Sequence, residues 1–358
     1  MIINNLSIQS LRNIGQADIS FSPKINLIQG GNGAGKTSLL EAIYLLARSR
    51  SFRQTHKNTL IKQSEEHLTV FAEAKTDRGV TKKIGLQKKG TETQIKVNGK
   101  RATKLSTLAI ALPIALITPH SHRIVEEGPE HRRRLLNWGV FHVKHQYQNQ
   151  LTKYNRVLMQ RNAAIKSGNA NPAIWDEQLD FYAKEITDLL EEYVHDWQVA
   201  VTALSQDIDL FKGIKLLYKR GWEKKTTFKA ALKTKLELDK RRGFTSVGPH
   251  RSDLLLQIEN NPVKQRLSRG QQKFLVTLLM LAQSRLQQEK NSEKAIILYD
   301  DFQSELDRES QKRLFKVIDD SECQTIMTLI ESDKEIISRM NSDDSMFHVE
   351  HGSFTHQV

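Results

Sequence analysis

Gly30-Gly31-Asn32-Gly33-Ala34-Gly35-Lys36-Thr37 decides the fold, because this stretch matches the phosphate-loop pattern G-x-x-x-x-G-K-[ST]. Residues 25–29, which precede it, form a short apolar run that is typical of a buried strand. After it, apolar residues recur at helical spacing: Leu39, Leu40, Ile43, Tyr44 and Ala47. The glycines allow consecutive backbone N–H groups to surround a phosphate at the N-terminus of the helix. The sequence therefore predicts a nucleotide-binding α/β core.

A second motif, residues 295–301, supplies the acids that such a loop needs. Its apolar strand ends in Asp300 and Asp301. Asp300 is placed to hold a Mg²⁺ ion together with the hydroxyl of Thr37, and Asp301 to orient or deprotonate the attacking water. Lys36 is expected to reach the β- and γ-phosphates. A strand with two terminal acids is by itself more often a turn, but the phosphate loop upstream favours a site for ATP and Mg²⁺.

The stretch 267–273 opens a long amphipathic helix predicted for residues 271–288. Ser268 is a natural N-cap, and a small residue followed by Gly270 and Gln271 makes the helix start a second phosphate-binding end. Two such ends can close on one nucleotide within a subunit or across a dimer. The residues alone leave both arrangements open.

The pattern of predicted strands and helices divides the chain into three parts. Residues 1–125 predict strands at 2–8, 17–21, 67–74, 81–87, 94–97 and 112–118, with Asn98-Gly99 as a tight turn. Residues 126–245 are mainly helical, with one apolar stripe: Ile174, Leu179, Tyr182, Ile186, Leu189, Leu190, Tyr193 and Trp197. Residues 246–358 return to alternating strands and helices. We predict a parallel-sheet P-loop core with an antiparallel β subdomain, split in sequence by a helical insertion.

Charge favours a polyanionic partner. The formal net charge is +13, and cationic side chains that neutralise phosphates release condensed counterions. The surplus is local, since residues 212–242 hold 12 lysines and arginines against 3 acids. Candidate DNA contacts are this stretch and the predicted hairpin residues Lys82, Lys83, Lys88, Lys89, Lys100 and Arg101. Arg132, Arg133 and Arg134 cannot all share one helical face, so at least one faces solvent or is scaffold.

Two further features bear on location. Cys323 is the only cysteine, which suits a reducing cytosol and excludes an internal disulfide. No apolar window approaches the ~18 residues that a membrane-spanning helix needs. We expect a cytoplasmic protein without a membrane partner.

The motifs together resemble the ABC-type ATPases of the SMC-like group, and most closely the RecF family of bacterial recombination proteins. The phosphate loop, the LSxGQ-like signature, the strand with two aspartates and Ser304-Glu305-Leu306-Asp307 carry the likeness. Further segments match that family in order and context: Leu11-Arg12-Asn13-Ile14, Leu116-Ile117-Thr118-Pro119, Gly128-Pro129 with Arg132-Arg133, Asn137-Trp138-Gly139, Arg161-Asn162-Ala163, Arg220-Gly221-Trp222-Glu223 and Gly248-Pro249-His250-Arg251.

The resemblance implies a homodimer that forms on ATP, with Lys36, Thr37 and Asp300 of one subunit facing Ser268 and Gly270 of the other. Asp307 would lie near that interface, and Arg12 near the nucleotide. The family binds single-stranded, duplex and gapped DNA, hydrolyses ATP weakly with stimulation by DNA, and helps to load recombinase with RecR and RecO. It also supports the SOS response.

Two positions depart from the family pattern. His120 stands where many relatives carry an acid, and no switch histidine follows the predicted strand 325–328.

Three other classes of protein share some of these features. A membrane-transporter ATPase shares the phosphate loop and signature, but transporters usually place them about 100 residues apart, whereas Lys36 and Ser268 are 232 apart. Neither a coupling glutamine nor a switch histidine is recognisable. A long coiled-coil protein is excluded because the insertion is too short for a rod. A DNA clamp that does not hydrolyse ATP remains open.

Overall fold

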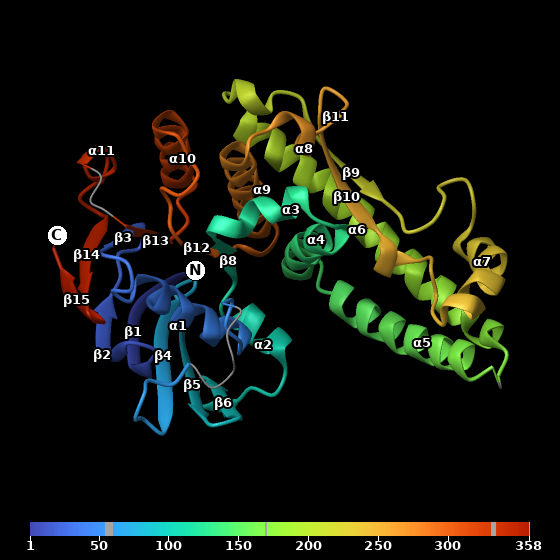
Figure 1. The fold of residues 1–358 in the computed structure, drawn as a ribbon, viewed down its shortest axis with the longest axis horizontal. Coiled ribbons are helices and arrows are strands. Elements are labelled where there is room, and N and C mark those ends of the chain that lie inside the picture. Colours follow the sequence, from blue (N-terminus) through green and yellow to red (C-terminus); the bar gives the residue numbers. More distant parts are fainter. Residues whose placement is uncertain (54–59, 169, 331–333, 358) are drawn as a thin grey trace. The chain divides into compact units, whose positions relative to one another are not determined.

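The computed structural model describes residues 1–53, 60–168, 170–330 and 334–357. Contacts within the chain define two compact units, one made of residues 1–122 with 269–358 and one of residues 123–268 (Figure 1). The first unit is thus split in sequence by the second, as predicted. The predicted insertion, residues 126–245, ended earlier than the second unit does. Residues 246–268, which the sequence placed with the C-terminal half of the core, belong to the second unit.

The first unit contains a mixed sheet in which both halves of the core meet. Its strand order is β15-β14-β3-β13-β12-β8, and all neighbours are parallel except β14 and β15. The strands are β3 (Ile25–Gln29), β8 (Ile114–Ile117), β12 (Ile296–Tyr299), β13 (Thr325–Leu329), β14 (Ser345–Glu350) and β15 (Ser353–His356). Because β3 pairs with β13 from the far end of the chain, the phosphate loop and the two aspartates leave the same edge of this sheet.

A second sheet of the first unit is antiparallel, with the order β2-β1-β4-β5-β6-β7. Its strands are β1 (Ile2–Leu11), β2 (Ile14–Ser20), β4 (His67–Lys75), β5 (Thr81–Lys89), β6 (Glu92–Val97) and β7 (Lys100–Arg101). Asn98 and Gly99 between β6 and β7 have φ of 51° and 78°, as a two-residue hairpin turn requires. The predicted antiparallel subdomain is confirmed.

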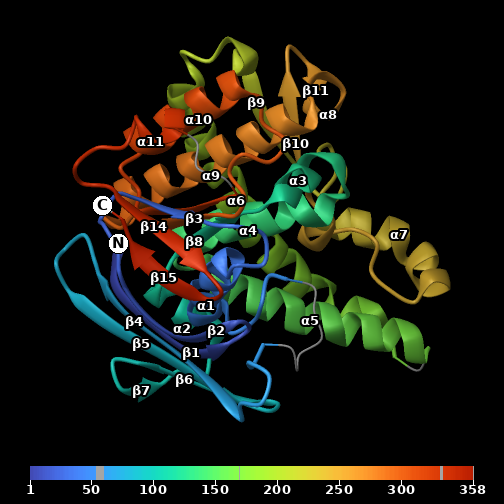
Figure 2. The ribbon, with the colours of Figure 1, turned by 60° about the vertical axis from the view of Figure 1, so that its left-hand side comes forward.

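The helix α1 (Lys36–Arg48) holds the two sheets together (Figure 2). Its residues Leu39, Leu40, Ile43 and Leu46 are fully buried and share one hydrophobic cluster with strands of both sheets. The other helices of this unit are α2 (Leu105–Ala111), α9 (Arg269–Asn291), α10 (Arg308–Asp320) and α11 (Lys334–Ile337), with a 3-10 turn at Pro119–His122. The predicted strand 112–118 is shorter than expected, and β14 and β15 were not predicted.

The second unit is mainly helical. Its helices are α3 (Arg123–Glu126), α4 (Pro129–Val143), α5 (Tyr147–Ser167), α6 (Asp176–Ser205), α7 (Phe228–Arg242) and α8 (Val263–Arg266). The described residues of this unit also form 3-10 turns at Pro172–Trp175, Asp209–Phe211 and Pro249–Arg251. A small sheet that the sequence did not predict has the order β11-β10-β9, formed by Asn261–Pro262, Asp253–Ile258 and Ile214–Lys219. Its middle strand contains the apolar residues Leu254, Leu255, Leu256 and Ile258.

Side-chain burial in the second unit follows the predicted helical face. Leu179, Ile186, Leu190, Tyr193 and Trp197 of the stripe are buried along α6, whereas Ile174 is exposed because it lies in the 3-10 turn before the helix.

The arginine triplet divides between scaffold and solvent, as predicted. Arg132 pairs with Asp253 at 2.8 Å, Arg133 donates to the carbonyl oxygen of Ser252 at 2.8 Å, and the side chain of Arg134 is 73% exposed.

Candidate nucleotide-binding site

The phosphate loop connects β3 directly to α1, as the sequence predicts. Gly33 and Gly35 have φ of 76° and 123°, in the region that favours glycine. At Gly30 a Cβ atom would lie 2.3 Å from the carbonyl oxygen of Val349 in β14, so only glycine fits this close approach. Asn13 holds the loop from outside, since its Nδ2 donates to the carbonyl oxygen of Gly33 at 3.0 Å. The conformation of the loop therefore depends on contacts with β14 and with Asn13 as well as on its own glycines.

The side chain of Lys36 lies across this loop. Its Nζ donates to the carbonyl oxygens of Gly30 at 2.6 Å and Gly31 at 2.8 Å. Burial lowers the pKa of Lys36, and the negative charges of Asp301 and Asp300 oppose that shift. An ammonium group that donates to two carbonyl oxygens of the loop is positioned to donate to anionic phosphate oxygens in their place.

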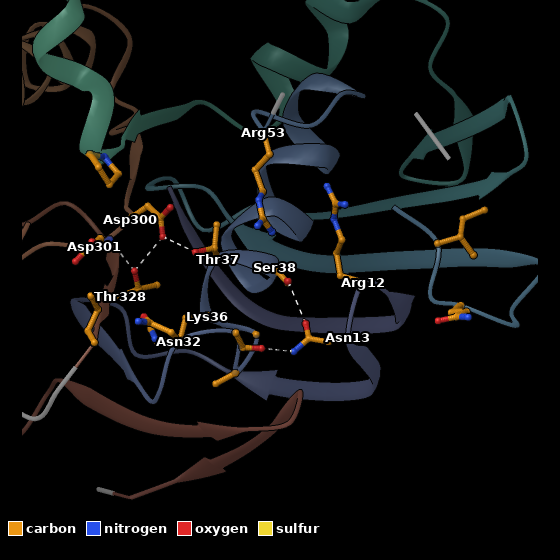
Figure 3. Close-up of a pocket in the computed structure, with 17 residues that line it drawn as sticks. Arg12, Asn13, Asn32, Lys36, Thr37, Ser38, Arg53, Asp300, Asp301 and Thr328 are labelled. Carbon is orange, nitrogen blue, oxygen red and sulfur yellow. Dashed lines mark hydrogen bonds between the residues drawn. The ribbon is translucent and has the colours of Figure 1, made fainter. Parts of the chain in front are cut away.

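Asp300, Thr37 and Thr328 form a compact hydrogen-bonded group (Figure 3). The Oδ1 atom of Asp300 accepts from the hydroxyl of Thr37 at 2.9 Å and from that of Thr328 at 3.1 Å. Burial raises the pKa of Asp300, and these two hydrogen bonds oppose the shift. A buried carboxylate with two hydroxyl neighbours is a set of hard oxygen donors, which Mg²⁺ prefers.

Asp301 leaves β12 in an uncommon backbone conformation, with φ of 52°. Its backbone N–H donates to the hydroxyl of Thr328 at 2.8 Å, and its carbonyl oxygen accepts from Nζ of Lys273 at 2.8 Å. The Oδ1 atom is buried and has no hydrogen-bond partner among the described residues. A buried carboxylate oxygen without a donor is costly, so this atom is suited to receive a hydrogen bond from a water molecule or from a metal-bound water.

These residues surround one cavity of about 770 Å³. Its lining comprises Arg12, Asn13, Asn32, Gly33, Ala34, Gly35, Lys36, Thr37, Ser38, Arg53, Ile61, Gln63, Pro119, Asp300, Asp301, Thr328 and Ile330. All predicted loop residues from Asn32 to Thr37 and both aspartates are thus brought together. Gly30 and Gly31 do not line the cavity, although their carbonyl oxygens accept from Lys36. The volume falls within the range of small-molecule sites.

Arg12 lines this cavity, as the family likeness implies. The buried carboxylate of Glu41 orients the Arg12 guanidinium. Its Nε and Nη2 atoms each donate to the carboxylate of Glu41 at 2.9 Å, and Glu41 is fully buried in α1. Arg53 lies 3.9 Å from the same carboxylate, and the hydroxyl of Ser51 donates to it. Glu41 therefore balances two arginines at the cavity wall.

The residues of the LSxGQ-like signature lie at the start of α9 and not at this cavity. Ser268 immediately precedes α9, and Gly270 and Gln271 belong to its first turn. Among the described residues of the first unit, neither Gly270 nor Gln271 lines the cavity. Asp307 caps α10, where its carboxylate accepts a hydrogen bond from the backbone N–H of Ser310 at 2.8 Å. This hydrogen bond lowers the pKa of Asp307. It does not line the cavity either.

The sequence assigned no site role to Asn13, Arg53, Gln63 or Thr328, which all line the cavity. Thr328 reaches the site because β13 pairs with β12 and ends at the same sheet edge, and the sequence carries no signal for that pairing. A glutamine at the cavity, Gln63, was not recognised in the sequence. His120 is exposed beside the lining residue Pro119. Residues 331–333, where a switch histidine was sought, lie outside the described residues.

Acids accompany several of the predicted DNA-contact lysines. Lys83 pairs with Glu73 at 3.2 Å and Lys89 with Glu66 at 3.0 Å. In the stretch 212–242, Arg220 pairs with Glu191 at 2.7 Å and Lys240 with Glu237 at 2.8 Å. In each pair the acid weakens the positive field that the cation offers to a phosphate.

No group of three or more His, Cys, Asp or Glu side chains in the described ranges could hold a metal ion alone. No helix among the residues that the structure describes is long and apolar enough to span a membrane.

Comparison with known proteins gives one consistent answer. The profile of the RecF/RecN/SMC N terminal domain matches residues 2–355. The DNA replication and repair protein RecF of Shewanella baltica is 37% identical over 99% of both chains, and that of Shewanella oneidensis is 38% identical over the same share.

Solved structures agree. The recombination mediator protein RecF with ATP superposes with a TM-score of 0.85 at 26% identity, covering 100% of this chain and 98% of that one. The head of SMC bound to a domain of ScpA, at 16% identity and a TM-score of 0.62, shares the fold. These relatives do not favour the transporter ATPase considered above. The chain has the ABC-type ATPase core and belongs to the RecF family of DNA replication and repair proteins.

Proposed function

We propose that this chain is an ATP-dependent DNA-binding protein of recombinational repair and replication restart. ATP drives two copies together, and the dimer binds DNA at single-strand gaps, hydrolyses ATP slowly with stimulation by DNA and helps to load recombinase. RecR and RecO are its expected partners, support of the SOS response is an expected consequence, and the cytoplasm is its expected location. The observation that carries the proposal is the meeting of Lys36, Thr37, Asp300 and Asp301 at one cavity beside the phosphate loop.

The residues at this cavity suit ATP with Mg²⁺. Lys36 would exchange its two loop carbonyls for β- and γ-phosphate oxygens, which its charge favours. The N–H groups of the loop would hold the same phosphates at the N-terminus of α1. Thr37 and Asp300 would hold Mg²⁺, because their oxygens lie 2.9 Å apart and Asp300 is buried without a cationic hydrogen-bond partner among the described residues. The ion, when bound, neutralises charge on the phosphates.

Asp301 is proposed to orient the attacking water and to accept its proton. Its unpartnered buried Oδ1 atom supports this role, and its backbone is fixed by Thr328 and Lys273. An aspartate reaches less far than a glutamate, which agrees with the slow turnover that we propose.

The positions of the signature residues support a site completed by a second copy. Gly270, Gln271 and Asp307 do not line the described cavity of their own chain. We propose that Ser268, Gly270 and Gln271 of the partner copy contact the γ-phosphate, with Asp307 close to that interface. ATP would then join the two copies directly.

Substitution of Lys36 tests the proposal. Lys36→Met and Lys36→Arg should abolish ATP-stimulated binding to duplex and gapped DNA, measured by fluorescence anisotropy, because neither side chain can replace the ammonium contact to the phosphates. ATP-stimulated binding that equals wild type in both variants would contradict the mechanism.

A second substitution separates nucleotide binding from dimerisation. Ser268→Arg introduces a large cation where the partner's phosphate must approach. We expect ATP to bind the monomer as in wild type, while gel filtration with ATP and Mg²⁺ shows no dimer. A dimer of wild-type stability would exclude the proposed interface.

Phosphate release distinguishes the ATPase from a clamp that binds ATP without hydrolysing it. We expect slow release by wild type, faster with duplex DNA and absent in Lys36→Met. No release above that of Lys36→Met, with DNA present, would favour the clamp.

A further inference from the structure

A second cavity of about 340 Å³ lies in the first unit, where α1 ends against the β5–β6 hairpin. Its lining consists of three cations, four hydroxyl side chains and three leucines: Arg50, Arg53, Lys88, Ser49, Ser51, Thr91, Thr93, Leu45, Leu60 and Leu86. No Asp or Glu is among the described residues of this lining. The cavity therefore offers cations and neutral donors to an anion.

The direction of Lys88 follows from the alternation of β5. Ile84, Leu86 and Lys88 are buried on the face that packs toward α1, whereas Lys83 and Lys89 point to the opposite face. Lys83 and Lys89 carry the acidic partners named above. Lys88 is 9% exposed, and its side chain makes no hydrogen bond or ion pair with any described residue. The lysines of this strand thus form two sets, and only Lys88 enters the cavity.

Two neighbouring positions, Thr93 and Arg50, add further hydrogen-bond donors to the cavity. Thr93 lies directly opposite Lys88 in the β5–β6 pairing and lines the cavity with it. Arg50 follows the end of α1 and is exposed at the rim. Charge-assisted hydrogen bonds from lysine and arginine, with hydroxyl donors beside them, are the set that holds a phosphate group.

We propose that this cavity binds a backbone phosphate of nucleic acid, through Arg50 and Lys88 with the hydroxyls of Thr91 and Thr93. The inference rests on the proposed DNA-binding function and deepens it by giving the contact a place. Arg53 lines both this cavity and the nucleotide cavity, so it is left unchanged in the test. A free phosphate ion has the same chemistry as a backbone phosphate, and the experiment separates the two.

The test uses three double variants. Arg50→Gln with Lys88→Gln removes the cavity charges. Lys75→Gln with Lys96→Gln removes two exposed charges from the other face of the same sheet. DNA affinity is measured by anisotropy with a labelled duplex, ATP and Mg²⁺ over a salt series. Equal ATP affinity and equal unfolding temperature to wild type establish that each variant folds, and Arg50→Lys with Lys88→Arg provides a charge-conserving rescue.

We expect about a tenfold loss of DNA affinity in the cavity variant, with a salt slope reduced by about 1, because one phosphate contact releases about one counterion. The control and the rescue variant should stay within about twofold of wild type. Wild-type affinity and slope in the cavity variant would overturn the inference and leave the proposed function intact.

The remaining outcomes are equally decisive. If inorganic phosphate stabilises wild type but not the cavity variant, while DNA affinity is unchanged, the cavity binds free phosphate only and the inference is wrong. If wild type shows no ATP-dependent DNA binding, the proposed function itself fails.

Discussion

The ammonium group of Lys273 donates a hydrogen bond to the carbonyl oxygen of Asp301 over 2.8 Å. It makes a second bond, to the carbonyl oxygen of Ser304 at 2.9 Å, and lies 5.1 Å from the centre of the Tyr299 ring. Lys273 is fully buried in α9, and Asp301 begins the loop that follows β12. The bond therefore connects α9, the signature helix, to this acidic loop within one chain. Burial lowers the pKa of Lys273 to about 8, against the attraction of Asp301, Glu305 and Asp300.

Replacement of this lysine should loosen the acidic loop. Lys273→Met keeps the length of the side chain but removes both donors, and an unsatisfied buried carbonyl costs about 1–3 kcal/mol. We expect a lower unfolding temperature and at least about a tenfold loss of phosphate release, with ATP affinity retained. The exposed Lys290→Met on the same helix should change neither quantity. Unchanged phosphate release in Lys273→Met would show that this bond does not position Asp301.

Removal of the Asp300 charge should separate stability from activity. Burial raises the pKa of Asp300, so its ionised form lowers the stability of the nucleotide-free fold as pH rises through that pKa. We expect Asp300→Asn to lose at least about a hundredfold in phosphate release, because a neutral amide holds Mg²⁺ poorly. Its unfolding temperature without nucleotide at pH 7 should be equal to or above that of wild type. A large drop in that temperature would contradict the assignment, and the exposed Asp320→Asn serves as the control.

A methyl group at Gly270 should displace the start of α9. A Cβ atom there would lie 2.0 Å from the carbonyl oxygen of Glu305, well inside contact distance, and that atom is backbone. We expect Gly270→Ala to destabilise the fold by about 2–4 kcal/mol, in the range of strained substitutions. Gly128→Ala is the matched control, because nothing lies within 4 Å of its Cβ position before α4. Denaturant unfolding that gives equal stabilities for the two variants would refute the predicted clash.

The buried pair of Tyr154 and His250 should make stability depend on pH. The hydroxyl of Tyr154 donates to Nδ1 of His250 at 2.7 Å, because Nε2 lies 3.0 Å from the carbonyl oxygen of Thr245 and carries the proton. Burial lowers the pKa of His250 to about 4 from 6.5, against that carbonyl bond. The unfolded chain therefore binds more protons between these values, so stability is full above pH 6.5 and falls toward pH 4.

The loss from this one group is at most about 3 kcal/mol. Denaturant unfolding at pH 7.5, 5.5 and 4.5 should show a steeper decline for wild type than for His250→Gln, whose amide can make both bonds without titrating. Parallel declines for the two proteins would show that His250 does not remain neutral in the fold.

The sequence by itself determined the elements whose signals are local. The phosphate loop, the strand before it and α1 could be predicted because glycine conformation, apolar runs and helical periodicity are properties of neighbouring residues. The same holds for the acidic strand, the signature helix and the single face of α6. The split core was also predictable, since alternating strands and helices occur on either side of a mainly helical stretch.

Only the tertiary structure decided what these elements face. The place of Thr328 beside Asp300 depends on the pairing of β12 with β13. The hydrogen bond from Arg12 to Glu41 depends on how α1 packs against β1. The bond from Lys273 to Asp301 joins residues 28 positions apart through the docking of α9. Lys88 is buried and Lys89 is exposed because only one face of β5 packs against the rest of the unit. Such contacts are set by packing between distant segments, and no periodicity within a segment records which neighbour it will meet.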